Sequence, residues 1–459
     1  MRPTRWRRST HVAVGVAVLA LVAALVAVAA VLTGQRSSEA NAVTPAPPPA
    51  TASPGVIPVD ISARTPTVAG LAAALAPALA DPDLGDVTGR ITDASSGVQL
   101  WERGADIPMQ PASVNKVLTT AAALLALDRD ASVTTTVLAS TGQPGLVVLR
   151  GGGDTTLSAA PAGTDTWYKG AARISDLAEQ VRQSGVQVSA VQVDTSAYSG
   201  PTMAPGWDPA DIAGGDIAPI ESVMLDGGRT QPVTVESRRS VTPALDAGRA
   251  LAVALKVDPA TVVVASGTVG GRPIATVQSA PLIERLRQMM NESDNVMAES
   301  IAREVAAEVG RPQSFDGGVA AVLDQLEAVG IDIAGAKLVD SSGLSVDDRL
   351  TALTLDDVVN AAAGDTEPAL RPLVDLLPIA GGSGTLSNRY LDTVPGRAAA
   401  GWLRAKTGSL TGTNALAGII TDADGRVLTF ALISNNAGLS GRTAIDTLAA
   451  VLRSCGCGT

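Results

Sequence analysis

The run Val117–Leu127, "VLTTAAALLAL", carries no charged residue. A helix of this composition has no polar face to turn toward water, so it must lie at the centre of a fold with other elements around it. Pro111 suits the first turn of such a helix, and Ser113 and Lys116 stand at its start. The sequence therefore predicts a body built around this helix, with a serine and a lysine at one end of it.

The N-terminal segment predicts export. Four arginines (Arg2, Arg5, Arg7 and Arg8) precede 21 uncharged residues from Val12 to Leu32. A secretory signal core is usually shorter than this, and a membrane span needs about 20 apolar residues. We therefore favour an uncleaved membrane anchor over a cleaved signal peptide. Because arginines stay on the cytoplasmic side, either reading makes the rest of the chain extracytoplasmic.

Histidine usage excludes two common kinds of site. The only histidine is His11, which precedes the apolar run, so the exported body has none to act as a general base or as a zinc ligand. The only cysteines, Cys455 and Cys457, lie at the C-terminus, where a frayed tail is the simpler reading than a strained bridge. A serine nucleophile in this chain would need a lysine or a carboxylate as its base. We expect no metal and no cofactor.

Lys116 is the candidate base. The chain has five lysines, and only Lys116 has a serine three residues before it. Positions i and i+3 share one helix face, so the hydroxyl of Ser113 and the amine can meet. Burial would lower the pKa of Lys116 toward a value useful for a base. The pattern alone is weak, and a capping serine beside a surface lysine remains the alternative.

Two further polar patterns lie downstream. Ser293-Asp294-Asn295 interrupts a long helical region and offers a hydroxyl and an amide that can donate and accept hydrogen bonds. Lys406-Thr407-Gly408 precedes a predicted hairpin, where lysine and threonine can hold a carboxylate and glycine permits close approach of a backbone. An edge lysine that deters aggregation is the other reading of Lys406.

Composition limits the partners. The net charge is −11, so no basic field is available for phosphates and we expect no nucleic-acid partner. Aromatic residues make up 2% of the chain, so the cores must consist of Ala, Val, Leu and Ile.

The pattern of elements predicts an α+β fold. Helical and hairpin patterns at both ends of the body indicate an antiparallel sheet flanked by its first and last helices. Between them, strand-like segments alternate with turns and a single short helix at 171–185, which indicates an inserted β-rich unit. The predicted boundaries are 1–33 for the N-terminal arginines with the anchor or signal peptide, 34–62 for a Pro/Ala/Ser-rich linker, 63–130 and 281–454 for the two parts of the main domain, 131–280 for the insert and 455–459 for the tail.

Ser-x-x-Lys, Ser-Asp-Asn and Lys-Thr-Gly, in that order, make the chain resemble serine β-lactamases and penicillin-binding proteins. The stretches "PASVNK", "GGGDTTL", "SGPTMAPGW", "NESDNVMAE", "VDSSGLSVDDRLT", "LPIAGGSGTLSNRY" and "AKTGSLTGTNALAGII" narrow the resemblance. They are similar to the D-alanyl-D-alanine carboxypeptidase/endopeptidase family, the class C low-molecular-mass penicillin-binding proteins. The likeness runs from about Pro66 to Arg453. The first two motifs stand 180 residues apart, which is consistent with that family's inserted domains.

The resemblance implies a β-lactamase/transpeptidase-like fold and a role for each motif. Ser113 would be the nucleophile and Lys116 its base. Ser293 would relay a proton to the leaving D-alanine, and Asn295 would hold the substrate amide and Lys116. Lys406, Thr407, Gly408 and Ser409 would bind the substrate at its terminal carboxylate, with the backbone N–H groups of Ser113 and Ser409 as the oxyanion hole. Ser341 and Ser342 receive no catalytic step.

The implied substrates are peptidoglycan stem peptides, and β-lactam antibiotics are the implied covalent inhibitors. A serine β-lactamase is one alternative, distinguished by a short-lived penicillin adduct. A non-catalytic wall-binding protein of the same fold is the other, distinguished by the absence of D-alanine release. The sequence does not distinguish a carboxypeptidase from an endopeptidase. It also leaves open the third residue of the stem peptide, the role of the insert and the oligomeric state.

Overall fold

The computed structural model describes residues 15–31 and 62–454. The chain divides into two compact units, 1–58 and 59–459, which we describe separately. In the first unit, residues 15–31 are helical and exposed. The other residues of the predicted span, 12–14 and 32, lie outside the described part, as do 34–61 of the predicted linker and the tail with both cysteines. Within the described ranges, no helix combines the length and apolar character needed to cross a membrane.

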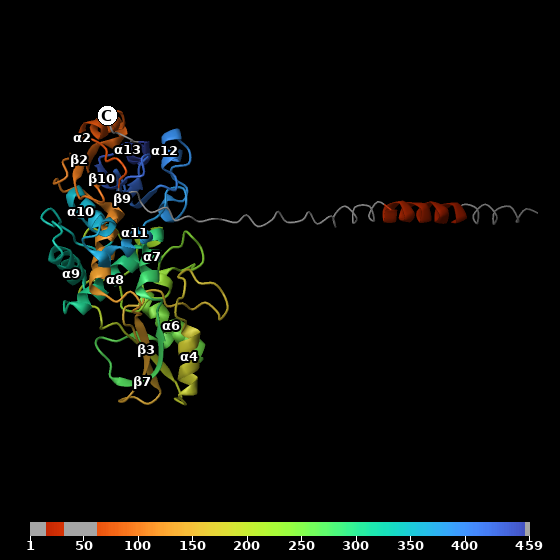
Figure 1. Cartoon of the computed structure of the whole chain (residues 1–459). Coiled ribbons are helices and arrows are strands. Elements are labelled where there is room, and N and C mark those ends of the chain that lie inside the picture. Colours follow the sequence, from red (N-terminus) through yellow and green to blue (C-terminus); the bar gives the residue numbers. More distant parts are fainter. Residues whose placement is uncertain (1–14, 32–61, 455–459) are drawn as a thin grey trace, which may run out of the picture. The chain divides into compact units, whose positions relative to one another are not determined.

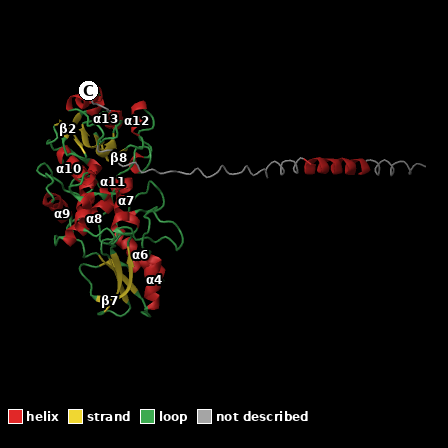
Figure 2. Cartoon of the chain, in the orientation of Figure 1, coloured by secondary structure: helices red, strands yellow, loops and turns green. Residues whose placement is uncertain are grey.

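The second unit contains two five-stranded sheets (Figure 1, Figure 2). The first sheet is antiparallel throughout, as predicted, with the strand order β2-β1-β10-β9-β8. Its strands are β1 (Asp86–Asp93), β2 (Gln99–Arg103), β8 (Leu403–Leu410), β9 (Thr413–Thr421) and β10 (Val427–Asn435). Strand β1 pairs with β10 from Asp86–Asn435 to Asp93–Leu428, so the two ends of the domain meet at the centre of the sheet.

Each face of this sheet is buried against helices. In β10, Phe430 and Leu432 join a core with α2 (Val68–Leu79) and α13 (Gly441–Ser454), the predicted first and last helices. The alternate residues Ala431 and Ile433 join a second core with α3 (Lys116–Ala126) and α10 (Ala352–Ala363). The period of two along the strand assigns its side chains to opposite layers. Helices α7 (Leu282–Glu292), α8 (Asn295–Glu308), α9 (Phe315–Ala328), α11 (Pro372–Leu376) and α12 (Val394–Ala399) complete the domain.

Helix α3 is central, as its lack of charge predicted. Every residue from Lys116 to Leu124 is buried. It is preceded by a 3₁₀ turn at Ala112–Asn115, so Ser113 lies in this turn rather than in the α-helix itself. Ala112, directly before Ser113, has a φ of 50°, in the left-handed region that a residue with a Cβ rarely adopts.

The second sheet lies within 134–278 and has the order β6-β5-β4-β3-β7. Its strands are β3 (Thr134–Ser140), β4 (Leu146–Arg150), β5 (Ala190–Asp194), β6 (Val263–Val264) and β7 (Gly271–Gln278). The sheet is mixed, because β5 runs parallel to β4 and to β6. Figure 1 shows it at the end of this unit opposite α2 and α13.

The prediction of a single short helix in the insert is wrong. Three helices are present, namely α4 (Ile174–Gln183), α5 (Ala210–Gly214) and α6 (Pro243–Leu255), and α4 and α6 share a core with the sheet. A parallel strand pair needs a crossover connection, and α4 supplies it between β4 and β5. The insert belongs to the same compact unit as the main domain.

Candidate active site

The structure brings Ser113 and Lys116 together. The amine of Lys116 donates to Ser113 Oγ at 3.0 Å, to Asn295 Oδ1 at 2.6 Å and to the carbonyl oxygen of Ser342 at 2.8 Å. These three acceptors match the three donor positions of a lysine ammonium. The Lys116 side chain is completely buried, so it is not a surface lysine beside a cap.

Burial lowers the pKa of Lys116 to about 8, although carboxylates at Asp340, Asp294, Glu299 and Asp348 oppose the shift. The ordinary lysine value is 10.5. A low-polarity site disfavours the ammonium form, and each carboxylate favours it. The result is an amine that loses its proton near neutral pH while it contacts a serine hydroxyl, which is the requirement for a general base.

The second motif lies where two helices meet. Helix α7 ends at Glu292, and Ser293 adopts a left-handed conformation with φ 58°. Asp294 then caps α8, because its side chain accepts a hydrogen bond from the backbone N–H of Met297. Asn295 begins α8 and donates through Nδ2 to the carbonyl oxygen of Asp216 at 3.0 Å. This break turns Ser293 and Asn295 toward the cavity, which both residues line.

The third motif lies on strand β8. The amine of Lys406 donates to Ser293 Oγ at 2.9 Å and to the carbonyl oxygen of Thr407 at 2.9 Å. Burial lowers the pKa of Lys406 well below its usual value, and the charges of Lys116 and Arg389 lower it further. The hydroxyl of Thr407 donates to Thr385 Oγ1 at 2.8 Å. Lys406 and Ser293 therefore form a second amine–hydroxyl pair beside the first.

Gly408 has a packing role that the sequence did not predict. A Cβ at this position would lie 2.6 Å from the carbonyl oxygen of Pro111 and 3.1 Å from Ala112 Cβ. Strand β8 thus approaches the turn that carries Ser113 at a distance that only glycine permits.

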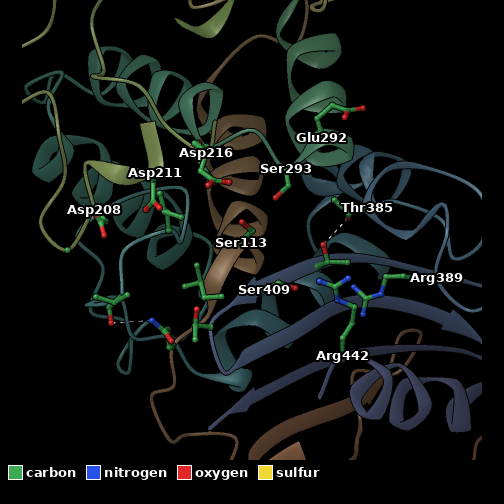
Figure 3. Close-up of a pocket in the computed structure, with 18 of the residues that line it drawn as sticks. Ser113, Asp208, Asp211, Asp216, Glu292, Ser293, Thr385, Arg389, Ser409 and Arg442 are labelled. Carbon is green, nitrogen blue, oxygen red and sulfur yellow. Dashed lines mark hydrogen bonds between the residues drawn. The ribbon is translucent and has the colours of Figure 1, made fainter. Parts of the chain in front are cut away.

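A cavity of about 750 Å³ joins the three motifs (Figure 3). Ser113, Ser293, Asn295, Thr407 and Ser409 all line it, whereas Lys116 and Lys406 lie behind its wall. Figure 3 shows Asp208 and Asp211 on one side of Ser113, and Glu292, Arg389 and Arg442 on the other. The insert contributes Asp208, Asp211 and Asp216 to the lining, and Glu292 is the last residue of α7. The pKa of Asp211 is raised by burial and by its two acidic neighbours.

The loop at 340–345 was missed as part of the site. Its Ser342 carbonyl is one of the three acceptors of Lys116. Asp340 holds the loop, because one carboxylate oxygen accepts from the backbone N–H groups of Ser342 and Gly343 at 2.9 and 2.6 Å. The other oxygen accepts from Trp207 Nε1 at 2.8 Å. The stretch "VDSSGLSVDDRLT" was the available signal, but no residue type marks a backbone carbonyl as a ligand.

Comparison with known proteins supports these features. The model of the D-Ala-D-Ala carboxypeptidase 3 (S13) family matches residues 71–238 and 233–454. The model of the carboxypeptidase Rv3627c-like N-terminal domain matches residues 1–58. Carboxypeptidase DacB of Mycolicibacterium smegmatis is 81% identical, and carboxypeptidase Rv3627c of Mycobacterium tuberculosis is 64% identical, each over 100% of both chains.

More distant relatives agree. A D-alanyl-D-alanine carboxypeptidase of an Actinomadura species is 30% identical over 78% of this chain and 79% of its own length. The crystal structure of penicillin binding protein 4 from Haemophilus influenzae shares the fold, with a TM-score of 0.67 and 23% identity over 83% of this chain and 97% of that one. The family match covers nearly all of the second unit, including every predicted site residue. The chain therefore belongs to the D-Ala-D-Ala carboxypeptidase 3 (S13) family.

Proposed function

We propose that this chain is a serine-type D-alanyl-D-alanine carboxypeptidase that acts on peptidoglycan stem peptides through an acyl-enzyme on Ser113. The observation that carries the proposal is the 3.0 Å contact between the fully buried amine of Lys116 and Ser113 Oγ. An amine with a pKa of about 8 is partly neutral at physiological pH and can accept the hydroxyl proton.

In the first step, Ser113 Oγ attacks the carbonyl carbon of the penultimate D-alanine while its proton passes to Lys116 Nζ. The C–N bond to the terminal D-alanine then breaks. Ser293 passes its hydroxyl proton to the leaving amine and takes up the proton that Lys116 received from Ser113, so both side chains return to their starting states. Ser293 is suited to this relay because its hydroxyl oxygen contacts Lys406 Nζ at 2.9 Å. Water finally cleaves the ester, which releases the shortened peptide and restores the Ser113 hydroxyl.

The side chains of the Lys-Thr-Gly segment, two backbone N–H groups and Asn295 would bind the substrate. Lys406 would supply an amine donor for the terminal carboxylate, and Thr407 and Ser409 supply hydroxyl groups at the cavity wall. The backbone N–H groups of Ser113 and Ser409 would hold the developing oxyanion. Asn295 would contact the substrate amide and keep Lys116 in place.

The same serine would be acylated by β-lactams, whose amide carbonyl takes the position of the D-Ala-D-Ala bond. A penicillin binding protein 4 of Haemophilus influenzae has been crystallised with a β-lactam, and the chain shares its fold. The proposed substrate lies outside the cytoplasm, and the arginines before the apolar run are consistent with export. Cleavage of cross-links by the same site would make the enzyme an endopeptidase as well, and a digest of defined muropeptides would detect it.

Release of D-alanine from a pentapeptide stem tests the proposal. The purified full chain should release D-alanine, and Ser113→Ala should release none while keeping its melting temperature. Ser95→Ala is the matched control, because Ser95 lies in an exposed turn of the first hairpin. D-Alanine release by Ser113→Ala at the wild-type rate would assign the nucleophile to another residue.

A further inference from the structure

Two buried side chains of the insert reach the Ser-Asp-Asn motif. Tyr168 Oη donates to Asp294 Oδ2 at 2.6 Å, and Arg239 Nη2 donates to the same oxygen at 3.4 Å. Tyr168 is 1% exposed and Arg239 is 8% exposed. Tyr168 lies between β4 and α4, and Arg239 lies between α5 and α6. Two separate segments of the insert therefore converge on one carboxylate of the main domain.

This carboxylate stands between two residues of the proposed mechanism. Its Oδ1 accepts from the backbone N–H of Met297 at 3.1 Å and so caps α8. Its neighbours are Ser293, in the left-handed conformation, and Asn295, the first residue of α8. Because Asp294 stands between them in the chain and caps α8, anchoring its carboxylate holds in place the backbone from which the Ser293 hydroxyl and the Asn295 amide extend.

The insert also stabilises the charge of this group. A buried carboxylate without a partner costs several kcal/mol or takes up a proton. Although burial raises the pKa of Asp294, the Arg239 guanidinium and the Tyr168 hydroxyl, together with the Met297 N–H and the Lys116 amine, hold this pKa below its usual value. The pKa of Tyr168 is raised well above 10 by burial and by Asp294, so the phenol remains a neutral donor.

A second connection runs from Arg239 to the amide of Asn295. The guanidinium donates through Nε to the carbonyl oxygen of Gly215 at 2.8 Å and through Nη1 to that of Gly227 at 2.7 Å. The next carbonyl along the chain, that of Asp216, accepts from Asn295 Nδ2 at 3.0 Å. With Nδ2 held by the insert, the amide oxygen of Asn295 faces Lys116.

The backbone of the insert is shaped to permit these contacts. Gly227 has a φ of 63°, and a Cβ there would lie 2.2 Å from Tyr168 Oη and 2.9 Å from Arg239 Nη1. Only a glycine lets the two donors approach the same carboxylate at this point.

We infer that Tyr168 and Arg239 are positioning residues for the acylation step: they fix Asp294, and through it the Ser293 hydroxyl and the Asn295 amide that holds Lys116. The inserted segment would then complete the active site, in addition to any partner that it binds. This inference rests on the proposed role of Ser113 as nucleophile.

The test compares two tyrosines of the insert. The hydroxyl of Tyr168 contacts Asp294, the cap of α8, and the hydroxyl of Tyr198 contacts Ser300 within α8. Tyr168→Phe removes only the oxygen that contacts Asp294. Tyr198→Phe is the matched control, because Tyr198 Oη lies 3.0 Å from Ser300 Oγ on α8 and touches no residue of the motif. D-Alanine release and the rate of acylation by a fluorescent penicillin would be measured on the full chain, together with the melting temperature.

We expect Tyr168→Phe to lower kcat about tenfold, the equivalent of one hydrogen bond to a charged group, and to leave KM within about twofold. Tyr198→Phe should retain the wild-type kcat. Arg239→Lys, which keeps the charge but not the fork of donors, should lower kcat at least as much as Tyr168→Phe. In an Asp294→Asn background, the Tyr168→Phe effect should shrink, because the two side chains act as one unit.

Three outcomes would overturn the inference. One is a folded Tyr168→Phe variant that keeps the wild-type kcat. If Tyr168→Phe does not fold, a folded Arg239→Lys variant with the wild-type kcat would have the same meaning. Another is an equal loss in Tyr198→Phe, which would indicate general stabilisation of the insert. If the wild-type chain itself is not acylated, the proposed function fails and this inference fails with it. A normally acylated wild type beside an unaffected Tyr168→Phe overturns the positioning role alone.

Discussion

The chemistry of this site depends on the protonation state of Lys116. Its pKa is about 8 in the folded chain, against an ordinary value of 10.5. Below pH 8 the amine is mostly an ammonium and cannot accept the Ser113 proton. The rate of acylation by a fluorescent penicillin should therefore fall about tenfold per pH unit below that value and level off above it. A rate that stays constant between pH 6 and pH 9 would contradict the assignment of the base.

The same shift has a consequence for stability. Between about pH 8 and 10.5 the unfolded chain keeps the Lys116 proton and the folded chain does not. The unfolded state binds more protons, so the contribution of Lys116 to the free energy of unfolding increases with pH across this window. Lys116→Arg tests both the catalytic effect and the stability effect of this pKa shift. Arginine retains its proton, so the variant should lose acylation and should also lose the pH dependence that Lys116 gives to the free energy of unfolding. Lys256→Arg, at an exposed helix end, should keep the wild-type pH profile.

At this scale the sequence predicted the side chains of the site and missed its backbone. Ser113, Lys116, Ser293, Asn295 and Lys406 were identified from motifs, and all five lie together in the structure. The Ser342 carbonyl was missed, because every residue has a carbonyl and only the fold decides which one points at an amine. Tyr168 and Arg239 were missed for a related reason, since a contact made across 126 and 55 residues leaves no local pattern.

At the scale of elements, strand β8 approaches the turn that carries Ser113 closely enough to constrain the site. Gly408→Ala would place a methyl group 2.6 Å from the carbonyl oxygen of Pro111. We expect a loss of about 1–3 kcal/mol in the free energy of unfolding from overpacking, and a slower acylation because the nucleophile moves. Chemical denaturation and penicillin labelling measure the two effects. Gly267→Ala is the control, since a Cβ there meets nothing within 4 Å, and equal behaviour of the two variants would rule out this contact.

Local patterns predicted some elements of the insert and failed for others. Strands β3, β4 and β5 are rich in Val and Thr and lie in segments predicted to be strand-like, and the amphipathic helix α4 was predicted as well. Helix α6 was missed because "PALDAGRALAVAL" contains a proline and a glycine among small residues, although Pro243 stands at its first turn, where proline is favoured. The segment 260–269, "ATVVVASGTV", has a strand-like composition, yet only Val263–Val264 pairs, at the edge of the sheet beside β5.

At the scale of the whole molecule, all the proposed catalytic side chains and four apolar cores belong to the second unit. A chain that begins at Val59 should therefore fold and be acylated at the wild-type rate, with an unchanged melting temperature. Thermal unfolding and penicillin labelling of this shortened chain test the expectation. A chain that is folded but tenfold slower would show that residues 1–58 contribute to the site.

The order of strands in the first sheet could not be derived from local patterns. Strand β1 pairs with β10, more than 300 residues later in the chain, and hydrophobic periodicity carries no information on such a distant partner. The antiparallel arrangement of the first sheet was predicted, with the resemblance of the three motifs supplying the overall architecture. The mixed character of the second sheet was not predicted. Parallel pairing requires a crossover connection, and the one helix recognised in this segment does not by itself indicate which strands it connects in parallel.

The nucleophile can be identified by mapping the penicillin adduct. The full chain would be incubated with penicillin, digested, and its peptides analysed by tandem mass spectrometry. The mass of one intact penicillin should appear on the peptide that contains "PASVNK", with fragmentation assigning it to Ser113, and it should persist for minutes or longer. An adduct on any other serine, or none on a folded and active chain, would show that the buried amine of Lys116 does not serve as the base for Ser113.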